Sequence, residues 1–557
     1  TLTFTPDAPL LPDTTYEVVL PAGGIEDAAG NATTGYSFTF STGDAVGGNE
    51  APQITAFTGT VQVLAPGEAV TFAVVATDPE GGALDYRFDA GDGRAKEPWS
   101  ASAGVAFTYT QPGHYLARVQ VRDTEGSITT GSLPLTVVAP PVGPRPTQSS
   151  QIAIDGAGRA WAVNPDIDTV TVVDVATLDV EREVSACDDP RSVAIDLDGN
   201  AWVACHGDDR VVLLAAADGA VLAQIDTGYG SAPFGIALAP DGQTAWISLH
   251  GSGALLRVDV AGRAVTGTVA LGPTARAVAV SGDGARVYVS RFLSPLNHGE
   301  VWEVDTATLT LSRTLRLPKL GGAENADGAS AGRGVPNYLA GLAVSPDGAS
   351  LWVAANKPNV ERGALFGTPL DHDNTVRNLV ARIDLANGLV DRSIDIDNSD
   401  SSSALTFSPR GDYLFVTLQG NNELVVFDAL TLGGSAGLGG MVTRLQAGLA
   451  PQGVAVDAAT GRILVNNFMG RSVTVFDATP LLDAGGIDLA SSEIDTVAAE
   501  TLPAEVLAGK RIFYNAADER MASEGYISCA SCHVDGGADG RVWDFTQRGE
   551  GLRNTID

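Results

Sequence analysis

Short runs of alternating apolar and polar residues, separated by turns rich in glycine and aspartate, extend from the first residue to about residue 490. This period of two predicts half-buried β-strands. After residue 503 the period changes, and apolar residues at 504, 507, 508, 512 and 513 predict a short amphipathic helix that begins beside Pro503. The chain is therefore predicted to be mainly β, with a helical domain at its C-terminal end.

One supersecondary unit recurs seven times: a strand, an Asp-Gly type turn, an aromatic-rich strand such as "AWAVN" or "LWVAA", a polar loop and a third strand. The third strand ends in aspartate in every unit except the second. The turn glycines are Gly158, Gly199, Gly242, Gly284, Gly348, Gly411 and Gly461. Each unit alone would leave a sheet face and two edges uncovered, so the units are predicted to close into a seven-bladed propeller over residues 147–490. The repeats resemble those of YVTN-type β-propellers.

The insertions at 317–337 and 357–378 lengthen the fourth and fifth units and are predicted to be loops on one functional face. Upstream, "YEVVLPAGGIEDAAGN" and "YSFTFSTG" resemble the later strands of bacterial Ig-like domains, which assigns residues 1–45 to part of such a domain. Residues 51–138 contain "YRFDAGDG" and "FTYTQPGHYLARVQVRD" and resemble the PKD domain, an Ig-like sandwich. The proline-rich segment 139–146 is predicted to be a stiff connector.

Charge and hydropathy exclude several classes of partner. Lysine and arginine number 34 against 67 aspartate and glutamate, a net charge of -33, so the chain would repel nucleic acid and anionic lipid. No apolar stretch is long enough to span a membrane. The chain begins at Thr1, inside a strand-like pattern, so we expect that its natural start, with any signal peptide, lies upstream.

The residues that most strongly indicate a chemical function form the motif Cys529-Ala-Ser-Cys532-His533. A C-x-x-C-H sequence is typical of covalent haem c attachment, because two thiols on one helical turn reach the two vinyl groups and the next residue brings an imidazole beneath the iron. Half of a zinc site and a redox dithiol are the alternatives. A zinc site would need a second close pair of ligands, whereas the other two cysteines lie far upstream in the propeller.

The surrounding sequence, residues 509–555, resembles the first haem segment of the di-haem cytochrome c peroxidase and MauG-like families. The shared features are a glycine-lysine pair, an aromatic pair, "SCASCH", an aspartate-glycine pair and "RNT". The resemblance assigns 503–557 to the start of a truncated α-helical cytochrome c domain. It implies a second haem and a calcium ion, both held by chain beyond Asp557. Met521 is a candidate second iron ligand, with ordinary packing as its alternative, and Trp543 is expected to pack on the porphyrin or relay electrons.

Two further groups of residues lie on one face of the predicted propeller. Cys187 precedes the first strand of the second unit and Cys205 ends its second strand, so a disulfide is favoured over two free thiols. A disulfide and haem c maturation both indicate a compartment outside the bacterial cytoplasm: periplasm, cell surface or secreted. Four histidines follow the second strands of consecutive units: His206, His250, His298 and His372. Equivalent loops of adjacent blades are expected about 10 Å or more apart, which favours a docking surface for the haem domain, or solvated loop histidines, over a metal site.

Two functions follow from these features. The first is an exported haem c protein that transfers electrons to a redox partner protein or a small oxidant. It would act as a peroxidase-like oxidoreductase if the sixth iron position is open. The second is an extracellular propeller that binds a cell-surface protein or carbohydrate and carries an accessory haem domain.

Overall fold

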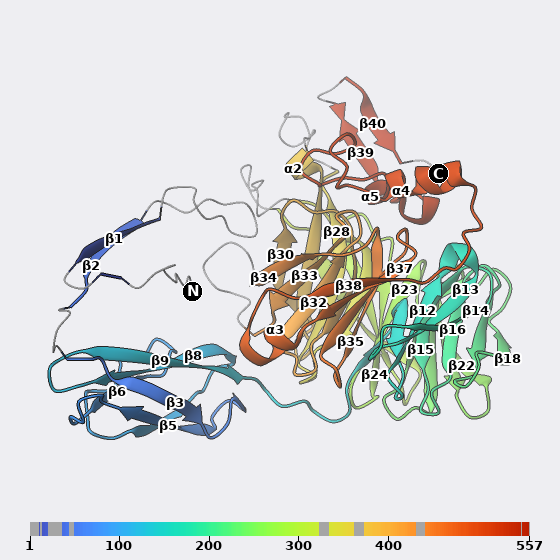
Figure 1. The fold of residues 1–557 in the computed structure, drawn as a ribbon. Helices are drawn as coiled ribbons and strands as arrows, with labels where there is room; N and C mark the ends of the chain where they lie inside the picture. The colour runs from blue at the N-terminus through green and yellow to red at the C-terminus, as the bar shows by residue number, and fades with distance from the viewer. Residues whose placement is uncertain are drawn as a thin grey trace. The chain divides into compact units, whose positions relative to one another are not determined.

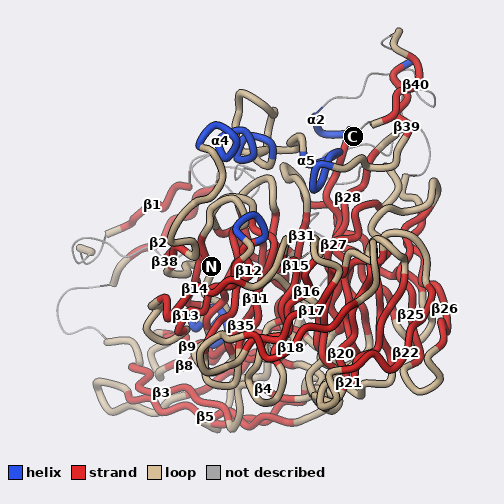
Figure 2. The backbone as a smooth tube through the Cα atoms, turned by 90° about the vertical axis from the view of Figure 1, so that its right-hand side faces the viewer, coloured by secondary structure: helices blue, strands red, loops and turns tan. Residues whose placement is uncertain are grey.

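The computed structural model describes residues 10–11, 14–20, 36–43, 49–321, 333–360, 372–430, 440–546 and 549–555. The chain divides into two compact units, Thr1–Ala139 and Pro140–Asp557. Strands make up most of the described backbone, and the helices are few and short (Figure 2). The prediction of a mainly β protein is confirmed.

The first unit holds an antiparallel pair of strands and a seven-stranded sandwich. The pair is β1 (Thr15–Leu20) and β2 (Tyr36–Ser41). Most of the remaining predicted Ig-like segment lies outside the described residues. The sandwich strands are β3 (Gln53–Gly59), β4 (Val63–Leu64), β5 (Ala69–Thr77), β6 (Asp85–Asp89), β7 (Gly104–Thr108), β8 (Gly113–Arg122) and β9 (Ile128–Val137). They form two sheets, in the orders β3-β5-β7 and β4-β9-β8-β6. The alternating residues Phe72, Phe88 and Val119 fill the space between the sheets.

Within its described residues the second unit contains seven antiparallel propeller blades, of which six are four-stranded and blade 4 is five-stranded (Figure 1). Blades 1 to 3 are β11 (Ile152–Ile154), β12 (Arg159–Asn164), β13 (Thr169–Asp174) and β14 (Val180–Ser185); β15 (Pro190–Ile195), β16 (Ala201–Cys205), β17 (Arg210–Leu214) and β18 (Val221–Asp226); and β19 (Pro233–Leu238), β20 (Thr244–Leu249), β21 (Ala254–Asp259) and β22 (Ala264–Ala270).

Blades 4 to 7 follow the same order. They are β23 (Ala275–Val280), β24 (Arg286–Arg291), β25 (His298–Asp305) and β26 (Thr310–Pro318); β27 (Asn337–Val344), β28 (Ser350–Pro358), β29 (Val376–Asp384) and β30 (Leu389–Ile396); β31 (Ser402–Phe407), β32 (Tyr413–Leu418), β33 (Glu423–Asp428) and β34 (Met441–Gln446); and β35 (Pro451–Asp457), β36 (Arg462–Asn467), β37 (Ser472–Asp477) and β38 (Ser491–Asp495). Because β38 is the outer strand of blade 7, the propeller extends beyond the predicted end at residue 490.

The turn and strand signals of the repeats have clear structural roles. All seven predicted turn glycines have left-handed φ angles, between 69° and 82°, a conformation that costs glycine little. The second strands carry large buried aromatic residues, among them Trp161, Trp202, Trp246 and Trp352. These side chains pack between neighbouring blades. Stacked sheets with apolar faces therefore explain why the repeat closes into a ring.

Every blade consists of consecutive strands, so the ring closes by packing between blades 1 and 7. β11 lies against β35, and apolar residues of the two blades share one cluster. Hydrogen bonds also cross this junction, among them those from the Thr171 hydroxyl to the Thr496 carbonyl and from the Thr496 hydroxyl to the Asn164 side chain.

The predicted connector continues into the axis of the propeller. Residues 142–151 pass along the first strands of several blades, and β10 (Thr147–Gln148) pairs with β23 as a fifth strand of blade 4. The contacts of this segment reach the carbonyl groups of Leu238, Val278, Leu405 and Ser408 and the side chain of Gln452. These carbonyls and the Gln452 side chain belong to blades 3, 4, 6 and 7, so the connector runs along the centre of the ring and makes polar contacts with four blades.

The remaining elements include the short helices η1 (Pro165–Ile167), α2 (His372–Thr375) and α3 (Thr479–Ala484). The C-terminal segment contains α4 (Ala504–Phe513), α5 (Ala530–His533), η2 (Val534–Gly536), β39 (Val542–Phe545) and β40 (Gly551–Asn554), and lies along one face of the propeller (Figure 1). In its described residues this segment holds less helix than predicted. Its apolar side chains pack on the propeller: Tyr514 on Phe468, and Trp543 on Val376.

Candidate functional site

The Cys529–His533 motif folds as a single helical turn. Cys529 has helical φ and ψ angles of −59° and −35°, and its carbonyl accepts the N–H groups of Cys532 at 3.3 Å and His533 at 3.0 Å. Both motif cysteines are free thiols; Cys529 is exposed and Cys532 is partly buried. The turn therefore brings two thiols and one imidazole together, as the motif spacing predicts.

A carbonyl beneath the His533 ring sets its tautomer. Its Nδ1 atom lies 3.2 Å from the carbonyl oxygen of Gly537. Because a carbonyl only accepts hydrogen bonds, Nδ1 carries the proton and Nε2 keeps its lone pair for a metal. The chain reaches Gly537 through two left-handed residues, Asp535 (φ 57°) and Gly536 (φ 77°).

An aromatic cavity lies beside this imidazole. It has a volume of about 300 Å³, and its walls include Thr375, Cys532, His533, Trp543 and Phe545. The rings of Trp543 and Phe545 are stacked, with centroids 6.2 Å apart and planes within 7°. A flat aromatic wall next to a thiol and an imidazole fits a planar macrocycle, so the residues present fit a haem group.

The surroundings of Cys532 favour its neutral thiol. Burial is the main reason that its pKa is raised, and Asp539 and Asp400 raise it further. Within the described part of the chain, the motif residues also do not join a group of three or more metal-ligating side chains.

Blade 6 holds the motif through one buried carboxylate. Asp400 is 1% exposed. Its oxygens accept the hydroxyl groups of Ser528 at 2.6 Å and Ser531 at 2.7 Å, which lie before and within the motif. Ser401, on the propeller, donates a third hydroxyl hydrogen bond at 2.8 Å.

Blade 5 contacts the same turn from another direction. The Tyr338 hydroxyl donates to the Cys532 carbonyl at 2.8 Å, and the Asn337 side chain donates to the Asp539 carbonyl at 2.9 Å. Tyr338 is buried, has a left-handed φ of 50° and stacks on Phe292 with ring centroids 4.7 Å apart. A tyrosine held in this sparsely populated conformation indicates that its position is fixed by the surrounding structure.

Blades 2 and 4 bind the residues just beyond His533. The Asp535 carboxylate lies between Arg191 at 3.0 Å and Arg276 at 2.8 Å. The Arg276 guanidinium is itself sandwiched between the rings of Phe234 and Phe292, at 3.9 and 3.8 Å from their centroids. The two arginines hold the pKa of Asp535 well below its usual range, against the effect of its burial. We refer to Arg191, Asp535 and Arg276 as the arginine clasp.

The clasp arginines line a small chamber of about 70 Å³. Its walls include Ser149–Gln151 of the connector and Val534 of the C-terminal segment. Serine, glutamine and asparagine side chains share these walls with apolar residues such as Phe234 and Phe292. The connector and the C-terminal segment therefore both border this chamber.

Two histidines of the rim lie close together. The rings of His206 and His250 have centroids 6.1 Å apart, and both contact the ring of Phe234. His206 pairs with Asp189 at 3.1 Å. Burial, with the positive charge of Arg276, lowers the pKa of His250 to about 3.

The other rim histidines lie in different surroundings. His298 pairs with Glu300 at 2.9 Å, and the side chain of His372 lies outside the described residues. Among the side chains that the structure describes, no three metal-ligating groups gather on this rim. The rim instead adjoins the arginine clasp.

The two propeller cysteines form a disulfide. Cys187 and Cys205 have Cα atoms 5.7 Å apart, and Cys205 ends β16. The disulfide joins the entry to β15 with the end of β16. It therefore lies beside His206 on the same rim.

Met521 lies apart from the aromatic cavity. Its side chain is 53% exposed and lines a separate surface depression formed by residues 516–525. Trp543 is 5% exposed and donates its indole N–H to Asp539 at 2.9 Å. The structure thus brings Trp543 to the motif and leaves Met521 outside the cavity.

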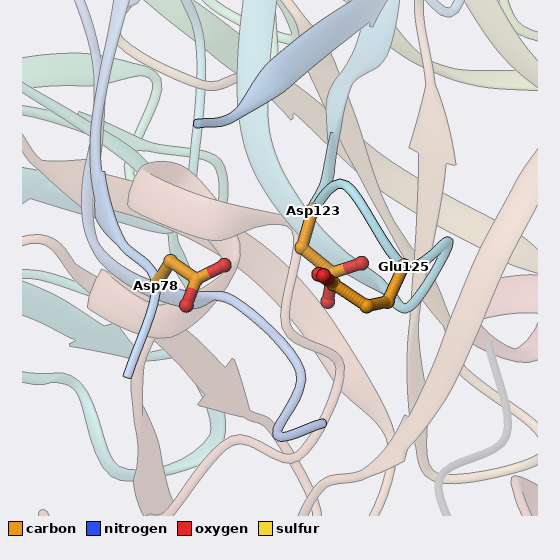
Figure 3. Close-up of side chains that lie close together, drawn as sticks. All are labelled: Asp78, Asp123 and Glu125. Carbon is orange, nitrogen blue, oxygen red and sulfur yellow. The ribbon is translucent and has the colours of Figure 1, made fainter. Parts of the chain in front are cut away.

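An acidic cluster in the sandwich escaped sequence reasoning. Asp78, Asp123 and Glu125 have oxygen atoms within 4.8 Å of one another (Figure 3). The signal was the repeated D-x-E-G sequence at residues 78–81 and 123–126. Asp123 already accepts the Gly126 and Ser127 N–H groups and the Asn49 amide, so turn formation explains its position.

Comparisons with known proteins agree with this architecture. Residues 53–133 match the model of the PKD domain, and residues 1–42 match that of a bacterial Ig-like domain. A comparison with curated protein sequences gives no match. The chain is a multidomain β protein in which Ig-like and PKD segments precede a β-propeller.

One solved structure reaches a TM-score of 0.50 against this chain, and others match with lower scores. The chain is similar to hydrazine synthase of Kuenenia stuttgartiensis, at 19% identity and a TM-score of 0.50 over 61% of this chain and 96% of that one. It is also similar to the dihydro-heme d1 dehydrogenase NirN in complex with DHE, at 16% identity and a TM-score of 0.40 over 75% of this chain and 74% of that one. A functionally unknown protein from Desulfotomaculum acetoxidans matches at 13% identity and a TM-score of 0.41, over 61% of this chain and all (100%) of that one. At such identities the similarity concerns the fold alone.

Proposed function

We propose that the chain is an exported haem c protein that transfers electrons. Cys529 and Cys532 would hold the porphyrin through thioether bonds, and His533 would bind the iron through Nε2. The observation that carries the proposal is the geometry of the motif: two free thiols and an imidazole of fixed tautomer on one turn, beside a cavity of about 300 Å³ lined by Trp543 and Phe545.

A bound haem would supply a one-electron couple between ferric and ferrous iron. The residues of this chain would hold it in place and orient its iron ligand. The carbonyl of Gly537 keeps the Nδ1 proton on His533, which raises the basicity of Nε2. Trp543, buried against Val376 and Phe545, forms an apolar wall beside the imidazole.

The proposal extends to a peroxidase-like activity if the sixth iron position is open. Met521, the candidate ligand for that position, does not line the cavity that His533 lines. This separation supports an open position. The second haem and the calcium ion that the family resemblance implies would need residues beyond Asp557 and belong to the same proposal.

Export is supported by two observations. The propeller carries the Cys187–Cys205 disulfide, a bond typical of oxidising compartments. PKD and Ig-like segments are typical of extracellular bacterial proteins. No described helix is both long and apolar enough to cross a membrane.

The test is expression with export and haem c maturation, followed by mass spectrometry and a pyridine haemochrome assay. We expect one haem on a peptide that contains Cys529 and Cys532, and loss of that haem in the Cys529→Ala, Cys532→Ala double variant. The Cys187→Ala, Cys205→Ala double variant is the matched control and should keep its haem. Unmodified thiols at 529 and 532 in matured protein would overturn the proposal.

Spin state and peroxide reactivity test the enzymatic part. High-spin ferric iron that reacts with hydrogen peroxide indicates an open sixth position. Six-coordinate, low-spin iron that does not react with peroxide eliminates the peroxidase-like activity and leaves electron transfer.

A further inference from the structure

One buried carboxylate contacts the interior of the attachment motif. Asp400 precedes β31 of blade 6 and is 1% exposed. Its two oxygens each accept a hydroxyl group from the motif region, Oδ2 from Ser528 and Oδ1 from Ser531. A carboxylate that is buried without such donors is strongly unfavourable, so the docked turn and the charged side chain depend on each other.

The surroundings of Asp400 are closely fitted. A Cβ atom on Gly420 would lie 2.2 Å from Asp400 Oδ2, so only glycine leaves room for the carboxylate there. The Asn421 side chain accepts the Asp400 N–H at 2.6 Å. On the motif side, Ala530 is fully buried and Ser531 is 3% exposed. The cradle therefore accepts the small residues of this particular motif.

Other contacts hold the ends of the turn, whereas Asp400 holds side chains inside it. Tyr338 contacts the Cys532 carbonyl, and the arginine clasp holds Asp535, beyond His533. Ser531 lies between the two cysteines, so its orientation directly affects where both thiols lie. Position 531 is variable in the C-x-x-C-H pattern, which requires nothing of it.

We propose that Asp400 is a positioning residue for haem attachment: the propeller fixes the motif through Ser528 and Ser531, so that Cys532 and His533 face the aromatic cavity. The role toward haem rests on the proposed function. The positioning of the turn does not, and it is measurable in protein without haem.

The first experiment measures the alkylation rates of Cys529 and Cys532 with iodoacetamide in the full-length apo protein, by peptide mass spectrometry. Rates are taken at several pH values, so that a change of thiol pKa is separated from a change of accessibility. Replacing Asp400 by Asn should raise the intrinsic rate at Cys532 about 10- to 100-fold, because an amide nitrogen replaces one of the two oxygens that accept the Ser528 and Ser531 hydroxyl groups. The rate at the exposed Cys529 should change little.

Three further variants complete the test. The Ser528→Ala, Ser531→Ala double variant retains the Asp400 charge and should also expose Cys532, whereas Ser531→Thr keeps the hydroxyl and should restore protection. Asp412→Asn is the matched control, because Asp412 is a fully buried carboxylate of the same blade that accepts the Ser408 hydroxyl at 2.5 Å and has no contact with the motif. Wild-type protection in both the Asp400 and the double-serine variants, or equal exposure in the Asp412 control, would overturn the proposal.

The second experiment uses matured protein. We expect the electron paramagnetic resonance signal of the haem to split into more than one species in the double-serine variant and to stay single in Ser531→Thr and in the Asp412 control. A single unchanged signal in the double-serine variant would refute the role toward haem. If wild-type protein carries no haem while Cys532 protection still depends on Asp400, the proposed function fails and the positioning of the turn stands.

Discussion

The arginine clasp should control how often the attachment turn leaves the propeller. Replacing Asp535 by Asn removes the charge between Arg191 and Arg276 and keeps a side chain that tolerates the left-handed backbone. Breaking a buried ion pair costs about 3–5 kcal/mol. The three side chains retain 11% to 20% exposure, so solvent screening lowers the expected cost to about 2–3 kcal/mol. That cost corresponds to a rise of about 30- to 150-fold in the open population of the turn.

Amide hydrogen exchange measures this opening. The N–H groups of Cys532 and His533 are hydrogen-bonded to the Cys529 carbonyl, so their exchange should accelerate by the same factor in Asp535→Asn, while the blade strands exchange as before. Asp518→Asn is the matched control, because its arginine partner is 83% exposed and such pairs contribute at most about 1 kcal/mol. Unchanged exchange of the turn in Asp535→Asn, or acceleration shared by the whole propeller, would refute this account of the clasp.

Three other outcomes follow from the contacts of the propeller face. The Cys187→Ser, Cys205→Ser double variant should lose about 3 kcal/mol of stability, the expected contribution of a disulfide that closes a loop of this size. Urea unfolding of blade 2, monitored by amide hydrogen exchange, measures this loss. An unchanged unfolding midpoint would contradict the prediction. His250 has a pKa lowered to about 3 by burial and a neighbouring arginine, so its contribution to stability is complete above about pH 6.5 and is lost as the pH falls toward 3. Its imidazole NMR signals should therefore not titrate between pH 8 and 4, and a midpoint near 6.5 would show that the ring is solvated. Tyr338→Phe removes the hydrogen bond to Cys532 and should accelerate amide exchange of the turn about 3- to 10-fold. If stacking on blade 4 alone fixes the Tyr338 side chain, the exchange should not change.

The propeller could be predicted from the sequence because its signals are local and repeated. Each turn glycine marks a backbone conformation that most other residues avoid, and each aromatic second strand marks a buried face. Seven repeats of the same signals leave one architecture that covers all the faces. The pairing of Cys187 with Cys205 followed from the same repeat, because it placed both residues at one end of one blade.

The Cys529–His533 motif was also recognisable in the sequence, but the propeller residues that contact it were not. Asp400 belongs to a run, "DIDNSD" at 395–400, whose composition is typical of turns. Nothing local distinguishes the carboxylate that accepts Ser528 and Ser531 from its neighbours, because the contact joins residues more than 120 positions apart. Long-range polar contacts between single residues carry no periodicity, so only the structure shows them.

The connector is a second feature whose contacts could not be predicted from the sequence. Proline-rich composition predicted stiffness for residues 139–146, and the structure places the continuation of this segment, β10, against β23 in the axis of the ring. Its polar side chains bind carbonyl groups that the first strands leave unpaired on the axis, such as that of Leu405. The composition therefore indicated a mechanical property, whereas the binding site for the segment exists only after the seven blades have assembled.

The docked turn joins parts of the ring that are far apart in sequence. Arg191 lies on blade 2, Arg276 on blade 4, Tyr338 on blade 5 and Asp400 at the entry to blade 6. These groups face one turn only when the ring is closed, so the turn binds the closed ring. A segment that binds only the closed state stabilises that state. Blades 1 and 7 share no strand, and they are joined by packing, by hydrogen bonds and by the Arg471–Asp166 ion pair. The C-terminal segment adds contacts at this junction, from Lys510 to Asp166 and from Tyr514 to Phe468. The propeller and the C-terminal segment therefore act as one cooperative unit, in which the contacts that hold the docked turn also join the blades.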